Sequence, residues 1–154
     1  MATWAEFERE APEIAAAGRM LLYQGPTAYG FLGTVRRDGG PRMHPICPVI
    51  AEGRLWAFIV NLGYKYFDLV RDGRFALHSF PTPAGGEEFY ATGVAATVDD
   101  ADLRASVVAA TGGILGTHDF EALFSFDLDH TLHTKWTNWG SANTWPEFAK
   151  WKAT

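Results

Sequence analysis

The sequence has very little cysteine and no long apolar run. Cys47 is its single cysteine, so neither an intramolecular disulfide nor a thiolate zinc cluster can form. No stretch approaches the roughly 20 apolar residues that a membrane-spanning helix needs. The first residues, MATWAEFEREA, are acidic where a secretion signal has a basic end. We therefore expect a cytoplasmic protein with no membrane partner.

Positive charge is also scarce. The chain has 13 Lys and Arg against 18 Asp and Glu, a net charge of −5, and no run of basic residues. A protein whose main partner is nucleic acid has a basic surface, so we expect no nucleic-acid partner. A chain of 154 residues is the length of one ordinary domain. We expect a single domain over residues 1–154.

Capping and breaker residues predict the first elements. Thr3 and Glu6 have the spacing of a capping box, which predicts a helix to about Glu10. Proline is tolerated near a helix start, so a second helix is predicted from Pro12 to about Tyr23.

Hydrophobic patterning predicts the rest of the fold. Strands are expected at 29–35, 42–50, 54–60, 74–80 and 87–98, helices at 64–70 and 99–111, and a strand, a turn and a strand over 122–136. Polar and apolar residues alternate too little along the strand at 54–60 for either of its faces to be in solvent. Gly93 predicts a bulge in the strand at 87–98. The order of these helices and strands along the chain favours an α+β fold, a mostly antiparallel small barrel with flanking helices.

The segment GPRMHPICPV, residues 40–49, places Pro45 and Pro48 in an expected strand. Proline cannot donate a hydrogen bond to a neighbouring strand. One explanation is that this side of the strand faces a bound cofactor, where the missing N–H is no loss. The other is a bulged edge strand in an ordinary barrel.

The segment NLGYK, residues 61–65, ends a strand and begins a helix. Lys65 falls in the first helical turn, where unpaired N–H groups and the helix dipole favour an anion. Arg42, on a neighbouring strand of a meander, could hold the same phosphate with its planar guanidinium. Taken singly, each residue could instead be a solvated surface charge.

The run from TVRRDGGPR through NLGYKYFDLVRDGRF to ALHSF resembles the core of the pyridoxamine 5′-phosphate oxidase-like flavin-binding split-barrel family. The resemblance covers about residues 27–98 and rests on the succession of motifs rather than on one motif. It implies a split β-barrel that forms a homodimer, with FMN, or the deazaflavin F420 in some relatives, at the interface.

The resemblance also implies site residues. It places Arg42 and Lys65 at the phosphate, Met43, His44 and Pro45 along the ring, and Asn61, Leu62 and Gly63 near the ribityl chain. Two positions depart from the family pattern. Glu88 stands where oxidases often have a glutamine facing the ring, and Tyr66 replaces a basic residue.

The function implied is an FMN-binding oxidoreductase that transfers a hydride to or from an unknown small molecule, with no catalytic side chain required. The carboxyl-terminal arginine and histidine motif of true pyridoxamine-phosphate oxidases is missing, so that substrate is not expected. The alternatives are an F420-dependent reductase and a non-enzymatic flavin, haem or tetrapyrrole-binding protein. A basic channel leading away from the phosphate would favour F420, whose tail is polyanionic.

Other candidate residues have weaker patterns. The segment DLDHTLH offers Asp127, Asp129, His130 and His133 as metal ligands, but residues three apart on a strand point to opposite faces, so no metal site is expected. His44 could act as a proton donor or, as in haem-binding relatives, as an iron ligand. Cys47 fits a small apolar filler. Trp136 or Trp139 could cover the cofactor from a partner chain.

Overall fold

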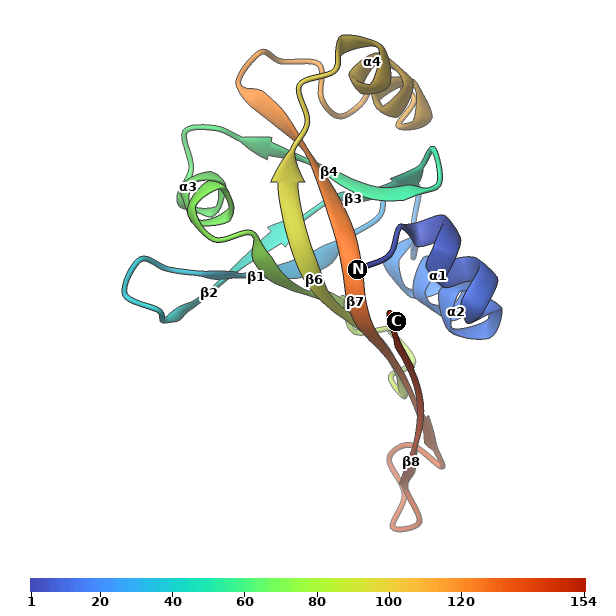
Figure 1. Cartoon of the computed structure of the whole chain (residues 1–154). Helices are drawn as coiled ribbons and strands as arrows, with labels where there is room; N and C mark the ends of the chain where they lie inside the picture. Colours follow the sequence, from blue (N-terminus) through green and yellow to red (C-terminus); the bar gives the residue numbers. More distant parts are fainter.

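The computed structural model describes all 154 residues and contains one sheet and four helices (Figure 1). The elements are α1 (Trp4–Glu10), α2 (Pro12–Leu22), β1 (Gly30–Val35), β2 (Pro41–Ile46), β3 (Pro48–Ala51), β4 (Arg54–Val60), α3 (Tyr64–Arg71), β5 (Arg74–Ser79), β6 (Glu87–Thr97), α4 (Ala101–Ala110), β7 (Glu121–Thr137) and β8 (Trp145–Lys152).

All strand pairs are antiparallel, and the sheet has the order β2-β1-β5-β6-β7-β4-β3, with β8 paired to β7. The α+β antiparallel barrel is therefore confirmed. The single strand predicted over 42–50 is wrong: β2 pairs with β1, and β3 pairs with β4. The chain changes partner at Cys47, between Ile46 and Pro48. Because β2 and β3 are the two ends of the sheet, the barrel is split there.

The strand, turn and strand predicted over 122–136 is also wrong. The segment forms one strand, β7, of 17 residues. Of its DLDH residues, which looked like a turn, Asp127, Leu128 and His130 pair with β6, and Asp129 is the extra residue of a bulge opposite Thr92 and Gly93. That register shift confirms the bulge predicted at Gly93. The last strand, β8, pairs with the second half of β7, and this two-stranded arm extends away from the barrel (Figure 1).

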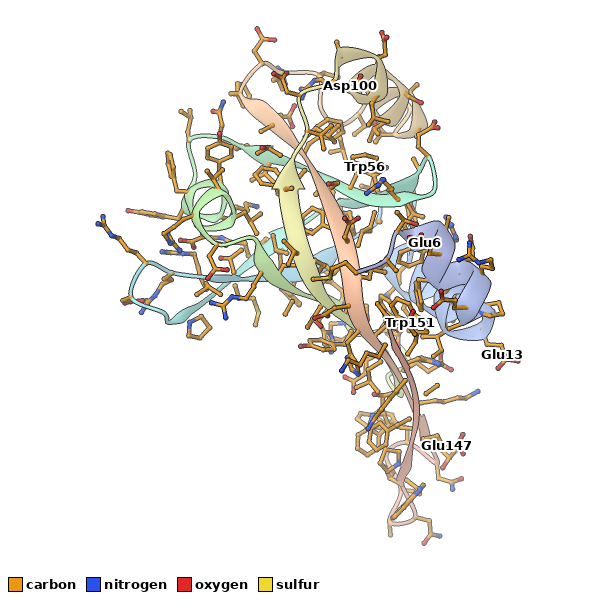
Figure 2. The ribbon with its side chains drawn as sticks, in the orientation of Figure 1. Glu6, Glu13, Trp56, Asp100, Glu147 and Trp151 are labelled. Atoms are coloured by element: carbon orange, nitrogen blue, oxygen red, sulfur yellow. The ribbon has the colours of Figure 1, made fainter.

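Helices α1 and α2 cover the main core. The predicted capping box is present, with the Glu6 N–H donating to Thr3 Oγ1 and the Thr3 N–H donating to Glu6 Oε2 at 2.7 Å. Phe7 is completely buried, and its ring centre lies 4.9 Å from that of Trp151 on β8. Figure 2 shows Trp151 beside these helices, where its indole N–H donates to Glu10 at 3.0 Å. The helical pair and the carboxyl-terminal strand therefore stabilise each other.

A smaller core lies on the other face of β4, under α4. It contains Val49, Trp56, Val107 and Leu123, and Figure 2 shows Trp56 on the α4 side of the strand. Leu55, Ala57 and Ile59 lie in the main core instead. The prediction that both faces of residues 54–60 are covered is confirmed. None of the four helices is long and apolar enough to cross a membrane.

Candidate functional site

The open edge of β2 explains its prolines. Strand β2 is an end strand of the sheet and pairs with β1 in an unbroken register from Gly30 and Ile46 to Val35 and Pro41. Of the bulged edge-strand alternative, the edge is therefore confirmed and the bulge is wrong. The Pro45 carbonyl accepts a hydrogen bond from Lys65 Nζ at 3.0 Å and therefore faces away from β1. The N–H and C=O of one residue point to the same side of an antiparallel strand. Pro45 thus places its missing N–H at the open edge, where no strand needs it.

The side chains of β2 alternate between two environments. Arg42 and His44 are half-buried and Ile46 is buried, whereas Met43 and Pro45 are exposed. Met43 is 71% exposed. The structure therefore brings Arg42 and His44 together on the face that α3 covers, and it places Met43 and Pro45 on the opposite face or at the edge.

Asp68, which the sequence reasoning did not identify, organises the cationic side of the site. Its side chain is 4% exposed and accepts hydrogen bonds from Thr34 Oγ1 at 3.1 Å, Arg42 Nε at 2.8 Å and the Arg71 guanidinium at 3.2 and 3.3 Å. Burial raises the pKa of Asp68, but the hydrogen bonds from Arg42, Thr34 and Arg71 outweigh it and lower the pKa below its ordinary value. An ionised Asp68 therefore holds Arg42 in place at neutral pH.

The contact with Asp68 leaves the end of Arg42 available. Only Nε of Arg42 donates to the carboxylate, and neither terminal nitrogen donates a hydrogen bond within the chain. The guanidinium lies over the ring of Tyr64, 4.6 Å from its centre. Cation–π stacking fixes the guanidinium plane without using its N–H groups. Arg42 is thus oriented by two side chains of α3 and retains both terminal nitrogens, with four N–H donors, for an anion.

Lys65 and His44 complete this cationic group. Lys65 is held to β2 by the Pro45 carbonyl, and burial lowers the pKa of its ammonium. Burial, then the charges of Lys65 and Arg42, lower the pKa of His44, so both cations lie near its ring. The His44 Nε2 atom is buried and has no hydrogen-bond partner. The imidazole is therefore neutral at pH 7 and has a ring nitrogen that the protein does not use.

Cys47 lies at the rim of this group, and burial raises the pKa of its thiol. The structure therefore agrees with a small filler and not with a reactive thiolate.

The segment between β4 and α3 adds an apolar surface to these cations. Gly63 is the N-cap of α3 and provides no capping side chain, and Asn61 is anchored by its backbone N–H to the Phe120 carbonyl at 2.8 Å. The neighbouring large apolar side chains, Val60, Leu62, Tyr64, Phe67 and Val70, are exposed, Leu62 by 79%. The helix predicted at 64–70 is confirmed as α3, which ends one residue later, at Arg71, and turns Asp68 and Leu69 to the interior.

The remaining residues singled out in the sequence lie elsewhere. Glu88 is on β6, 3.4 Å from His78 Nε2 on β5. Tyr66 packs edge-on against the buried Phe124. His130 pairs with Thr92 and His133 with Phe89, on opposite faces of β7. No group of three or more His, Cys, Asp or Glu side chains is close enough to hold a metal ion.

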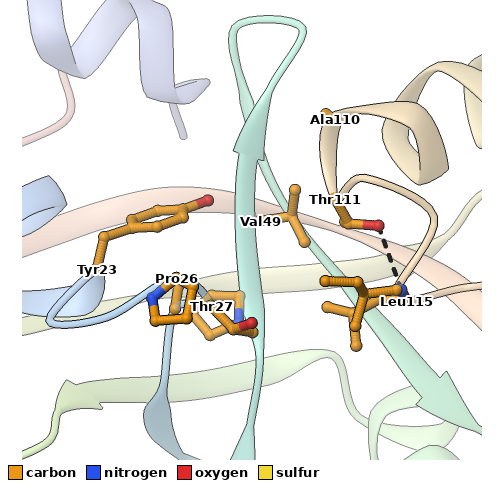
Figure 3. A pocket seen from close by; sticks show the side chains of 10 residues that line it. Tyr23, Pro26, Thr27, Val49, Ala110, Thr111 and Leu115 are labelled. Atoms are coloured by element: carbon orange, nitrogen blue, oxygen red, sulfur yellow. Dashed lines mark hydrogen bonds between the residues drawn. The ribbon is translucent and has the colours of Figure 1, made fainter.

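A small cavity lies apart from this site. Its volume is about 60 Å³, and it is bounded by the α2–β1 loop, β3 and the α4–β7 loop (Figure 3). Two of its polar side chains are already used: Tyr23 Oη accepts from the Ile50 N–H, and Thr111 Oγ1 accepts from the Leu115 N–H. Ligand pockets usually measure roughly 300–1,000 Å³, so this cavity is too small for a flavin or a haem.

The cationic group and the apolar surface beside it fit an amphipathic ligand that has a flat apolar ring and an anionic end. Two unused guanidinium nitrogens and the Lys65 ammonium suit a phosphate or carboxylate. Exposed Leu62 and Tyr64 suit the ring. FMN and haem both have this chemistry, and the buried unpartnered nitrogen of His44 is a further group that a ligand could use.

Comparison with known proteins shows the fold. No family model and no curated protein matches the chain. Among solved structures, one similar to this chain is a Clostridium acetobutylicum protein of the pyridoxinephosphate oxidase family, related to general stress protein 26. The two chains are 12% identical and superpose with a TM-score of 0.62. The match covers 96% of this chain and 95% of the other chain.

Two haem proteins have the same fold. HutZ, a haem storage protein from Vibrio cholerae, is 17% identical with a TM-score of 0.61, covering 77% of this chain and 89% of its own. A haem-binding protein from Mycobacterium smegmatis is 16% identical with a TM-score of 0.63, covering 89% of this chain and 57% of its own. The curled antiparallel sheet with its flanking helices is thus the split barrel of pyridoxamine 5′-phosphate oxidase-like proteins.

Proposed function

We propose that this chain is an FMN-binding oxidoreductase that acts on a small molecule. The observation that carries the proposal is the convergence of Arg42, Lys65 and a neutral His44 beside exposed apolar side chains. Arg42 and Lys65 would hold the phosphate, while the open edge of β2, from Met43 to Pro45, and the Asn61–Gly63 turn would hold the ring and the ribityl chain. Bound flavin supplies the hydride chemistry.

The protein's own residues have a positioning role in this proposal. Asp68 and Tyr64 fix the guanidinium of Arg42, so little rotamer entropy is lost when the phosphate binds. Lys65 is half-buried, which strengthens its attraction to an anion relative to a fully solvated lysine. Neutral His44 adds no like charge to the cationic group, and it could gain a proton when the phosphate arrives.

We further propose a homodimer with the cofactor at the interface. The support is the apolar surface around α3 together with exposed aromatic residues on the β7–β8 arm, which include Trp139, Trp145 and Phe148. Exposed apolar patches of this kind are typical of interfaces. A second chain would shield the ring from water, and Trp136 or Trp139 of the arm could cover it. Sedimentation with and without FMN measures the assembly.

A second candidate function is haem binding without flavin chemistry. The observation that favours it is the buried, unpartnered Nε2 of His44, whose lowered pKa keeps the ring neutral, as an iron ligand must be. Arg42 and Lys65 would then hold the propionates. Haem proteins also share the fold.

The testing experiment is an absorption spectrum of the purified chain before and after FMN, F420 or haem is added and unbound ligand is removed. FMN binding is expected to leave a flavin band that Lys65→Met and Arg42→Ala remove. Lys150→Met, on exposed β8, is the matched control and should retain it. A haem band lost in His44→Gln would support the second candidate. No retained chromophore would contradict both.

A further inference from the structure

We infer that a cleft between the end of α2 and the β5–β6 loop, residues 80–86, binds a small organic ammonium ion through Glu87. The ligand class is a primary amine with a short apolar chain, which is cationic at neutral pH. The cleft lies on other elements than the candidate site at β2 and α3 and shares none of its residues. The inference therefore does not rest on the proposed function.

The cleft has the size and the lining of a small-molecule site. Its volume is about 460 Å³, within the range of roughly 300–1,000 Å³ that is usual for ligand pockets. Met20, Leu21 and Tyr23 line it from the end of α2, and Pro83 and Ala84 line it from the loop. These largely apolar walls suit a hydrocarbon chain.

The loop side of the cleft is held in position by the protein itself. The Gly85 N–H donates to the Thr82 carbonyl at 2.9 Å. The Gly86 carbonyl accepts from the Trp136 N–H at 2.6 Å. Gly85 has a φ of +68°, and a Cβ at this position would lie 2.4 Å from Trp139 Nε1, so the loop packs directly against the β7–β8 arm. A loop fixed in this way loses little conformational entropy when a ligand binds.

Glu87 gives the cleft its charge. It is the one charged residue that lines the cleft, and its side chain is 27% exposed. Two basic groups lie beside the carboxylate, His133 Nε2 at 3.5 Å and Lys135 Nζ at 3.7 Å. Both distances exceed the roughly 2.7–3.2 Å of a hydrogen bond, and Glu87 accepts no hydrogen bond from the protein. Since buried polar groups usually have hydrogen-bond partners, the carboxylate can accept an N–H group of a ligand.

Two further polar side chains of the cleft offer acceptors. Gln24 Nε2 donates to the Leu21 carbonyl at 2.9 Å and to the Phe80 carbonyl at 2.8 Å, which leaves the side-chain oxygen free. Thr82 Oγ1 donates its single hydrogen to the Gly85 carbonyl at 3.1 Å and can only accept a further bond. An ammonium group, which has three donors and no acceptor, matches this set. The net charge of −5 attracts the same class of ligand.

The experiment is an NMR titration of the full chain at pH 7 with pentylamine, with neutral pentan-1-ol and with anionic pentanoate. Comparing the three ligands on the wild type requires no variant to fold. Glu87→Gln is the test variant, because it keeps the shape of the side chain and removes its charge. Glu88→Gln is the matched control, since it removes the same charge from the next residue of β6, which points to the opposite face of the sheet. Lys135→Met removes the ammonium group that competes for Glu87.

Pentylamine is expected to bind more tightly than pentan-1-ol, pentanoate least, with shifts at residues 20–24 and 82–87. Glu87→Gln should weaken pentylamine binding about tenfold and leave pentan-1-ol binding unchanged, because one hydrogen bond to a charged group is lost. Lys135→Met should strengthen pentylamine binding about twofold.

Three outcomes would overturn the inference. They are equal affinities of the wild type for pentylamine and pentan-1-ol, equal effects of Glu87→Gln and Glu88→Gln, and shifts that lie outside the cleft. None of them bears on flavin binding at β2 and α3, so the proposed function stands or fails separately.

Discussion

Replacing Asp68 with asparagine tests the central contact of the candidate site. Asparagine keeps the size of the side chain, but it removes the charge that Arg42 and Arg71 share. Breaking a buried ion pair costs about 3–5 kcal/mol, and an exposed pair is worth at most about 1 kcal/mol. The carboxylate is 4% exposed, whereas the two arginines are 27% and 37% exposed.

An intermediate cost of about 2–3 kcal/mol is therefore expected for Asp68→Asn at pH 7. For a chain of this length, this corresponds to a fall in Tm of about 4–12 °C. Asp99→Asn removes the same charge from an exposed position and is the control. Thermal and urea unfolding, followed by circular dichroism, measure both variants.

The pH dependence supplies a second measurement of the same contact. The pKa of Asp68 is lowered from the ordinary value of 3.8, so its contribution to stability is complete above pH 3.8 and is lost as the pH falls below that value. The stability difference between the wild type and Asp68→Asn should shrink in the same range. Equal Tm values for Asp68→Asn and Asp99→Asn at pH 7, or a difference that does not change in acid, would refute the reasoning.

Three further predictions concern the site and the core. Burial and two nearby cations lower the pKa of His44 from 6.5, so the free energy of unfolding should decrease as the pH falls below 6.5. This decrease should be smaller in His44→Gln. An NMR titration of His44 with a midpoint at or above 6.5 would contradict the prediction. In Gly93→Ala the new Cβ would lie 1.9 Å from the Asp127 carbonyl oxygen, so the bulge must shift, at a cost of about 1–3 kcal/mol in urea unfolding. Phe89 is fully buried, so Phe89→Ala should lower the free energy of unfolding by about 3–5 kcal/mol, measured by urea unfolding. A decrease below about 1 kcal/mol would show that the core relaxes to fill the space that the ring leaves.

Much of the fold could be predicted because the signals are local. The capping box at Thr3, the helix start at Pro12, the bulge at Gly93 and the two covered faces of residues 54–60 all follow from residue types and spacing, and all are confirmed. The barrel class followed from the order of the elements, although the sequence similarity to the solved structures is low.

The errors share one cause: each needed knowledge of the pairing partner. Residues 42–50 have a continuous β pattern, but the strand changes partner at Cys47 because β1 and β4 lie on different parts of the sheet. Asp127 and Asp129 looked like turn residues, yet long pairing with β6 keeps the segment extended as one strand. Local propensity cannot report either event, since both depend on which strand each segment pairs with.

The candidate site shows the same division. The sequence by itself pointed to Arg42 and Lys65, because a cation in a first helical turn and prolines in a strand are unusual locally, and the family resemblance added His44. Only the tertiary structure showed that Asp68 organises Arg42 and that Lys65 binds β2 through a backbone carbonyl. The hydrophobic pattern determines which faces are buried, whereas the meeting of polar groups from β1, β2 and α3 depends on how those elements pack, and no periodicity encodes that packing.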